Sequence, residues 1–384
     1  MARKSTRNAQ GGGTIRQRPN GRWEARYTVG RDPGTGKQIQ RSVYGSTQKE
    51  VRQKLAQITA AIDSGTYKEP CKMTLGQWLD IWQRDYLGGV KPATVTVYTG
   101  NIKNHIKPAL GAVRLDQLHP HAVQGFVNGL DLSPASVRLA YKVLHQALEK
   151  AVDLGYIARN PATKCELPRL EQKEIHPLDD QQVGALLSAV EGGPLEYLVN
   201  VALFTGLRQS ELLGLTWDAV DFQQGTINVN KQLSRAAHRA SGLFISPKSG
   251  KGRIIAAAPS VMVALKHQRA RQAEIQLRAG PLWDNPHGLV FTSKLGGPLE
   301  QWNVDQRFSA AVAAAGLEGV RFHDLRHTFA VASIRAGDDI KTVQGNLGHA
   351  TAAFTLDRYG HFTERMKQDS AQRMESFIKG VLNL

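Results

Sequence analysis

Residues that could bind and attack a phosphate group recur through the C-terminal half of the sequence. The first is Arg208, which is followed three positions later by Glu211. On a helix these two residues share one face, so the carboxylate can hold the guanidinium. A guanidinium held in this way offers fixed, paired donors to a phosphate. Taken alone, the pair is also typical of an ordinary surface ion pair.

A second segment, residues 323–327, contains two histidines and an arginine. His323 and Arg326 are three apart and can bind one phosphate together, the arginine as a fork and the histidine as donor or acceptor. His323 and His327, four apart, also have the spacing of a zinc site. However, Asp324 replaces the usual glutamate, no third ligand follows at the usual spacing, and Arg326 would bring a cation to the metal. We therefore expect no metal, and a helix-capping histidine is the plainer alternative.

Two further segments supply lysines and a tyrosine. Residues 244–255 predict two strands flanking a Gly-rich turn, a β-hairpin with Lys248 and Lys251 near its tip. A lysine there can reach a phosphate or a leaving oxygen, although a basic hairpin that contacts only solvent fits the pattern as well. Closer to the end of the chain, His349 follows Leu-Gly and precedes Tyr359. In isolation, such a tyrosine is most often a packed or exposed ring.

Three predicted units position these residues. Residues 14–44 alternate as strands do, and apolar residues at helical spacing follow up to residue 62, which predicts a three-stranded sheet plus a helix within residues 1–70. Residues 1–13 are expected to be disordered. Residues 71–163 predict a helical bundle, with a helix broken at Pro108 and Gly111, and residues 164–174 predict a linker. Residues 175–384 predict a mixed α/β unit with a C-terminal helix over 361–384, so the fold class is multidomain, mainly α with small β-sheets.

The composition favours a polyanionic partner. The formal net charge is +16, and residues 1–70 hold 14 Lys and Arg against 5 Asp and Glu, a surplus of 9. Such a surplus favours nucleic acid, because binding releases condensed counterions. Two cysteines without a C-x-x-C pair fit a reducing cytoplasm and argue against a zinc ribbon. We expect neither a signal peptide nor a membrane span, because the basic start leads into a polar, Gly-rich stretch and no long apolar run follows.

Taken in order, these segments resemble the full signature of the tyrosine recombinase, or phage-type integrase, family. The matching residues are Arg208 with Glu211, Lys248, His323 with Arg326, His349 and Tyr359. The layout is most similar to integrases of conjugative transposons and of phages of Gram-positive bacteria. Residues 94–111 resemble their core-site-binding domain, and residues 1–70 resemble their arm-binding domain. Lys248 is preferred to Lys251 because it follows the strand that the family's lysine follows, but the choice between the two stays open.

The resemblance implies a reaction that needs no cofactor and no metal. Tyr359 would attack DNA to form a 3′-phosphotyrosine, and Arg208 and Arg326 would neutralise the phosphate. His323 would act as base, helped by cations near the phenol. Lys248 would protonate the departing 5′-hydroxyl, and His349 would donate to a phosphate oxygen.

The resemblance also implies partners. We expect a homotetramer on double-stranded DNA with core and arm sites, a Holliday junction, accessory excision and host DNA-bending proteins, and a place in the bacterial cytoplasm at the nucleoid. The C-terminal helix is expected to dock into a neighbouring protomer, although packing on its own domain is an alternative. Candidate DNA-binding residues are Arg16, Arg22, Arg26, Arg41, Lys91, Thr94, Lys103, Lys107 and Lys251.

Two other functions share part of the pattern. A type IB-like topoisomerase would use the same chemistry, but DNA relaxation has no use for the second DNA site that the N-terminal module predicts. A non-catalytic DNA-binding regulator would not need the complete catalytic set.

Overall fold

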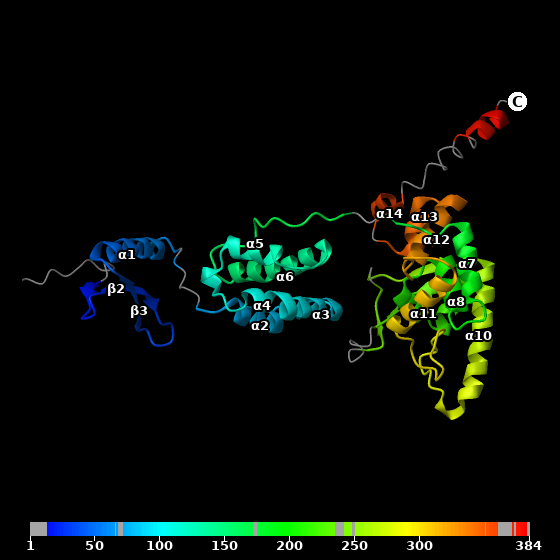
Figure 1. Cartoon of the computed structure of the whole chain (residues 1–384), viewed down its shortest axis with the longest axis horizontal. Helices are drawn as coiled ribbons and strands as arrows, with labels where there is room; N and C mark the ends of the chain where they lie inside the picture. The colour runs from blue at the N-terminus through cyan, green and yellow to red at the C-terminus, as the bar shows by residue number, and fades with distance from the viewer. Residues whose placement is uncertain are drawn as a thin grey trace, which may run out of the picture. The chain divides into compact units, whose positions relative to one another are not determined.

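The computed structural model describes residues 14–65, 67, 72–171, 175–234, 242–247, 250–349, 351–359, 371 and 374–381. The chain separates into two compact units, Met1–Glu171 and Gln172–Leu384. Helices predominate in both units (Figure 1). Among the described residues, the first unit also contains one antiparallel sheet and the second contains two. No helix in the described ranges is long and apolar enough to cross a membrane. The expected disorder of residues 1–13 concerns residues outside the described ranges.

The first unit begins with the predicted three-stranded sheet. Its strands β1 (Thr14–Gln17), β2 (Trp23–Arg31) and β3 (Gln38–Gly45) pair antiparallel in sequence order. Helix α1 (Gln48–Asp63) covers one face, where Val51 and Leu55 pack against Ala25 and Tyr27. The alternation along β2 therefore turns its apolar residues toward the helix, as the sequence predicts.

The other face of this sheet buries a carboxylate. Glu24 is 1% exposed, although it points away from the apolar core. It accepts hydrogen bonds from Arg16 Nε at 2.8 Å and Arg18 Nε at 2.9 Å, and Arg26 Nε lies 3.7 Å away. Hydrogen bonds from Arg18, Ser42 and Arg16 hold the pKa of Glu24 well below its usual range. This one carboxylate organises three arginines on the outer face of the sheet.

A helical bundle follows in the same unit. It consists of α2 (Leu75–Asp85), α3 (Pro92–Asn101), a π-helical turn (Ile102–Ile106), α4 (Lys107–Leu110), a 3-10 turn (Leu115–Gln117), α5 (Pro120–Asn128) and α6 (Pro134–Asp153). Trp78 is fully buried among these helices, and its Nε1 donates to the carbonyl of Ala147 at 2.8 Å. This bond ties α2 to α6 at the centre of the bundle.

The predicted helix break at Pro108 is wrong. The chain stays helical from α3 through the π-helical turn into α4, and it leaves the helix only at Gly111. The amide of Lys107 bonds to the carbonyl of Ile102, five residues back, so the turn before the proline is widened. Pro108 then lies in the first turn of α4, where a missing N–H and a fixed φ are tolerated.

The second unit is built around the apolar helix α8 (Glu196–Thr205). It packs against α7 (Asp180–Val190), α10 (Pro259–Ala279) and α12 (Asp324–Ala336), as Figure 1 shows. Nearly every side of α8 is buried, which explains why its sequence is apolar all round. The remaining elements are α9 (Gln209–Leu213), a 3-10 turn (Trp217–Ala219), β4 (Val220–Asp221), β5 (Thr226–Val229), β6 (Gln232–Leu233), β7 (Phe244–Ile245), β8 (Arg253–Ala256), a second 3-10 turn (Gly280–Leu282), α11 (Gln301–Ala314), α13 (Ile340–Leu347) and α14 (Ala352–Tyr359).

The predicted hairpin between β7 and β8 does not form. β8 pairs with β5, and β7 pairs with β6, so the two strands belong to different sheets. The chain runs along β5 and β6 and then returns antiparallel to them, first as β7 beside β6 and then as β8 beside β5. Two residues separate β5 from β6, whereas the seven residues 246–252 separate β7 from β8. The Gly-rich segment therefore connects strands of two different sheets and not the two strands of one hairpin.

Three helices among the described residues of this unit, α8, α12 and α13, end at left-handed glycines. Gly206 caps α8 with φ 63°, and Gly348 caps α13 with φ 62°. A side chain at Gly206 would collide with the ring of Phe329, and its Cβ would come within 2.9 Å of Leu347 Cδ2. Glycine at position 206 thus allows the end of α8 to lie against α12 and α13.

We predict that Gly206→Ala destabilises the second unit by roughly 1–3 kcal/mol, because the added Cβ overpacks the junction and φ is unfavourable for alanine. The measurement is the free energy of unfolding of the full chain in urea. Gly184→Ala in α7 is the control, because a Cβ there meets no atom within 4 Å. The control should be neutral or stabilising by about 0.5–1 kcal/mol, and equal effects of the two changes would contradict the packing argument.

Candidate active site

Five of the six predicted catalytic residues line one pocket of about 760 Å³ in the second unit. Arg208 occupies the N-cap position of α9, and His323 occupies that of α12, where its side chain makes no capping hydrogen bond. Arg326 lies in the first turn of α12, His349 lies between α13 and α14, and Tyr359 is the last residue of α14. The fold therefore brings together segments that are far apart in the sequence.

The sixth predicted residue, Lys248, lies outside the described residues. Lys251 is described, and it is exposed, two residues before β8 begins. Both lysines belong to the segment 246–252, and Ser246 is anchored through its carbonyl to Gln232 Nε2 at 3.1 Å. The assignment of the catalytic lysine stays a prediction.

Glu211 is buried between two arginines. Its Oε1 accepts from Arg208 Nη1 at 2.8 Å and from Arg253 Nη1 at 3.0 Å, and its Oε2 accepts from Arg253 Nη2 at 2.8 Å. The backbone amide of Arg208 also donates to Oε2 at 3.0 Å. Burial alone would raise the pKa of Glu211, but the hydrogen bonds from Arg253 and Arg208 lower it to about 2. Glu211 is therefore an anion at neutral pH.

Backbone carbonyls at two helix ends hold the arginines from the other side. The carbonyls of Asn346, Leu347 and Gly348, at the end of α13, accept from Arg253, Arg326 and Arg208 respectively. The carbonyl of Gly206, at the end of α8, accepts from Arg326 Nη1 at 2.7 Å. Carbonyls in the last turn lack helical partners and carry partial negative charge. Both helix ends therefore present acceptors that fit guanidinium groups.

The cluster keeps a positive surplus. Three guanidinium groups face one carboxylate, which leaves two uncompensated positive charges. Arg326 is 3% exposed, and burial together with the charge of Arg208 lowers its pKa to about 9. Arg326 therefore remains protonated at neutral pH, and the pocket is prepared to bind an anion.

Arg253 was not among the predicted site residues. It was assigned only to the strand after the Gly-rich segment, yet its side chain is 10% exposed and bonds Glu211. The strand pattern contains a usable signal: Arg253 is in phase with Ile255, which is 1% exposed, and out of phase with Ile254, which is 70% exposed. An arginine on the inner face of a strand requires a buried partner.

His349 is held by its neighbour along the chain. Its Nδ1 lies 2.9 Å from Thr355 Oγ1, and its ring stacks on that of Tyr359 with centroids 6.4 Å apart. Partial burial, followed by the charges of Arg326 and Arg208, lowers the pKa of His349 to about 3. The imidazole is thus neutral at pH 7, and Thr355 engages one of its two nitrogens.

Tyr359 is 1% exposed, and its hydroxyl lies 2.7 Å from His327 Nδ1. The charges of the nearby Arg326 and Arg358 favour loss of the phenol's proton. Burial raises the pKa of Tyr359, and the opposing charges of Arg326 and Arg358 are smaller effects. The phenol therefore keeps its proton at neutral pH.

His327 was considered in the sequence only as a metal ligand. Its ring meets that of His323 edge to face, with centroids 5.0 Å apart. No group of three or more side chains suited to a metal ion occurs among the described residues. The i, i+4 spacing placed both histidines on one face of α12, but it did not indicate that Tyr359 would lie opposite.

The candidate DNA-binding residues belong to three different parts of the chain. Arg16 and Arg26 surround Glu24, and Arg22 and Arg41 are exposed nearby on the same sheet. In the bundle, Lys91 and Lys103 are exposed, Thr94 is partly buried at the start of α3, and Lys107 pairs with Asp80. Lys251 belongs to the second unit.

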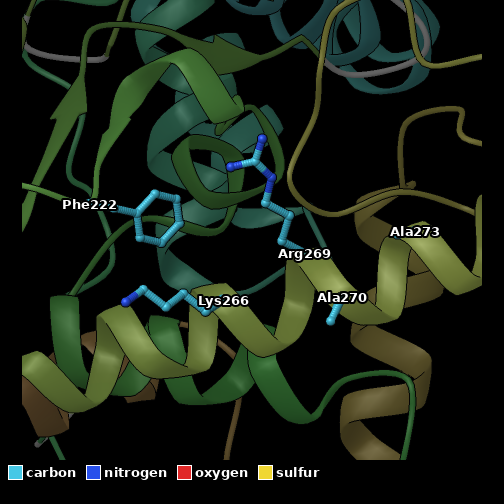
Figure 2. A pocket seen from close by; sticks show the side chains of 5 residues that line it. All are labelled: Phe222, Lys266, Arg269, Ala270 and Ala273. Atoms are coloured by element: carbon cyan, nitrogen blue, oxygen red, sulfur yellow. The ribbon is translucent and has the colours of Figure 1, made fainter.

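A second hollow, of about 520 Å³, lies along α10. Figure 2 shows Lys266, Arg269, Ala270 and Ala273 along this helix, with Phe222 from the turn after β4. None of these side chains belongs to the predicted catalytic set, so the hollow is not a candidate reaction site.

We predict that Glu211→Gln destabilises the chain by about 3–5 kcal/mol, because it leaves three guanidinium groups beside a neutral amide. The measurement is the free energy of unfolding in urea. Glu196→Gln is the control: its pair with Arg271, also at 2.8 Å, is about a quarter exposed. This control should cost about 0–1 kcal/mol, and a similarly small loss at Glu211 would contradict the role given to the carboxylate.

Comparisons with known proteins match both units. The model of the phage integrase family matches residues 177–366, and that of the phage integrase N-terminal SAM-like domain matches residues 74–130. A tyrosine recombinase XerC-like protein of Caldanaerobacter subterraneus subsp. tengcongensis is 29% identical over 372 residues, which cover 91% of this chain and 95% of that protein.

Two solved structures share the fold. The Tn1549 transposon integrase in complex with circular intermediate DNA has a TM-score of 0.66 at 22% identity, over 79% of this chain and 99% of that one. A lambda integrase tetramer bound to a Holliday junction has a TM-score of 0.59 at 22% identity, over 88% and 96% of the two chains. These relatives give the topoisomerase alternative no support. The chain belongs to the phage integrase family of tyrosine recombinases and is a site-specific DNA recombinase.

Proposed function

We propose that this recombinase integrates and excises a mobile element by cutting and rejoining DNA through a 3′-phosphotyrosine at Tyr359. The observation that carries the proposal is the pocket of about 760 Å³ that Tyr359 shares with Arg208, Arg326, His323 and His349. It combines a nucleophile with fixed cations, which are the two things that attack on a phosphodiester needs.

Arg208, Arg326, His349 and a lysine have distinct parts in this reaction. Attack places additional negative charge on the free phosphate oxygens, and Arg208 and Arg326 neutralise it with donors that are already oriented. His349 donates to a phosphate oxygen through the nitrogen that Thr355 does not engage. Lys248, or Lys251 in its place, protonates the departing 5′-oxygen.

The reaction as proposed takes no cofactor. Arginines do the work that Mg²⁺ does in many other phosphoryl transfers. The phosphotyrosine keeps the energy of the broken bond, so the strand can be rejoined without ATP. Two rounds of exchange through a Holliday junction complete the recombination.

We assign separate tasks to the parts of the chain. Residues 1–70 bind arm-type sites, and residues 71–163 bind the core site. Residues 164–174 link the core-binding part to residues 175–384, which carry out catalysis. The outer face of the N-terminal sheet supports the arm role. Glu24 fixes Arg16, Arg18 and Arg26 on this face, and a surplus of 9 positive charges lies in residues 1–70. Such a two-dimensional array can follow phosphates along a groove.

The C-terminal segment supports assembly between protomers. Residues 374–381 are helical, and Met374, Phe377, Ile378 and Val381 are 57%, 66%, 40% and 62% exposed. Leu382 and most of the remaining residues of the predicted helix 361–384 lie outside the described ranges. An apolar face that its own domain leaves uncovered fits docking into a neighbouring protomer of a DNA-bound tetramer.

The setting of the reaction follows from the family and its hosts. We place the recombinase in a bacterial cytoplasm, at the nucleoid when active, with accessory excision and host DNA-bending proteins as partners. The match to a bacterial recombinase along most of the chain supports this setting.

We predict that Tyr359→Phe abolishes the covalent protein–DNA adduct and leaves DNA binding intact, because only the hydroxyl is lost. The measurement combines a denaturing gel, using a nicked candidate attachment site, with a gel shift on the same DNA. Tyr197→Phe, a partly buried ring that packs against Arg271 away from the pocket residues, is the control and should behave as wild type. An adduct that survives Tyr359→Phe would show that the nucleophile is a different residue.

We predict that Phe377→Asp weakens tetramer formation on DNA while the free protein stays folded, because the apolar contact worth roughly 1.5–3 kcal/mol per buried side chain is lost. Sedimentation of the DNA complex and circular dichroism of the free protein measure the two effects. Ser376→Asp adds the same charge on the opposite side of this helix and should leave assembly unchanged. Normal tetramers with Phe377→Asp, or an unfolded monomer, would rule out docking in trans.

A further inference from the structure

We propose that His327, rather than His323, accepts the proton of the Tyr359 hydroxyl when this tyrosine attacks DNA, and returns it when the strand is rejoined. The inference rests on the proposed function, because it assigns the proton acceptor for the same nucleophile. It gives α12 two separate tasks, with His323 and Arg326 facing the phosphate and His327 facing the phenol.

The geometry distinguishes the two histidines. His327 Nδ1 lies 2.7 Å from Tyr359 Oη, and the two rings are tilted by 56° with centroids 5.8 Å apart. Among the described residues His323 makes no hydrogen bond to this phenol, and its ring contacts that of His327 instead. A base must lie within hydrogen-bond reach of the proton that it removes, and His327 meets this condition.

The protonation states fix the direction of the hydrogen bond. Partial burial, followed by the neighbouring His323, lowers the pKa of His327 to about 4, so its ring is neutral at pH 7. Tyr359 keeps its proton, because burial raises its pKa. The phenol therefore donates, Nδ1 accepts, and the hydrogen of the imidazole is on Nε2.

Charged groups around His327 favour transfer once DNA is bound. Asp324 is an anion beside the ring and raises the pKa of His327, which opposes the cations nearby. A phosphate in the pocket adds a further negative charge, so it stabilises the imidazolium formed by the transfer. The charged and titratable groups that line the same pocket as His327 are His176, Arg208, Glu318, Arg321, His323, Asp324, Arg326, His349, Arg358 and Tyr359.

The proposed step is balanced in atoms and charge. The Oη–H bond of Tyr359 breaks, and its proton moves to His327 Nδ1 as Oη forms a bond to phosphorus. The bond between phosphorus and the 5′-oxygen breaks, and that oxygen takes a proton from the lysine of segment 246–252. Rejoining runs the same transfers in reverse, so no outside acid or base is consumed.

The test is the pH dependence of adduct formation by the full chain. The DNA carries a sulfur in place of the bridging 5′-oxygen at the scissile phosphate, because a thiolate leaves without protonation and the measured rate then reports the attack. We expect the wild-type rate to be nearly flat from pH 6 to 9, since His327 is already neutral there. His327→Asn keeps a hydrogen-bond acceptor but cannot take up the proton, so adduct formation at pH 7 should fall about 100-fold or more and should rise with pH.

His323→Asn is the matched comparison. It should slow the reaction without introducing a rise with pH, because the proton acceptor is still present. A wild-type rate and flat profile with His327→Asn, or the rise with pH appearing in His323→Asn, would overturn the proposal. His327→Gln replaces the asparagine variant if the latter fails a check of folding and DNA binding. Failure of the proposed function gives a different result, namely no adduct with wild type or an adduct with Tyr359→Phe.

Discussion

Three guanidinium groups repel one another at short range, yet the second unit holds Arg208, Arg253 and Arg326 within one cluster. A single buried carboxylate, Glu211, binds Arg208 and Arg253. Backbone carbonyls at the ends of α8 and α13 bind Arg326, and those of α13 also accept from the other two arginines. Water could solvate these cations only if the pocket were open. The protein instead supplies fixed acceptors, so the cations stay oriented and partly unneutralised, which suits an incoming phosphate.

The same burial sets the state of the groups that would carry out the reaction. A low-dielectric pocket with surplus positive charge disfavours protonated imidazole, and the pKa values of His327 and His349 fall to about 4 and about 3. It also keeps the buried phenol of Tyr359 protonated, since desolvation opposes the anion more than the cations favour it. The proposed nucleophile is therefore inactive until DNA binds and a base removes its proton, which limits unproductive chemistry.

A second buried carboxylate that binds several arginines lies in the N-terminal sheet. Glu24 on the N-terminal sheet is covered by Arg16 and Arg18 as Glu211 is covered by Arg208 and Arg253. In both places one acid fixes several long side chains that would otherwise lose conformational entropy on binding DNA. The proposed arm-binding face and the proposed catalytic cluster thus use the same physical device for the same polyanion.

Local spacing placed Arg208 beside Glu211 and His323 beside Arg326, because partners three or four residues apart on a helix are neighbours whatever the rest of the chain does. The three-stranded sheet followed from the alternation along residues 14–44 for the same reason. His349 and Tyr359 were predicted only from the resemblance of the ordered segments to the family signature. Strand pairing is not local, so the sequence could not tell that β7 and β8 join different strands, and the widened turn before Pro108 left no pattern. The contacts of Arg253 with Glu211 and of His327 with Tyr359 span 42 and 32 residues. Only the packing of α12, α13, α14 and β8 around one pocket decided them, because residues that far apart meet through tertiary structure alone.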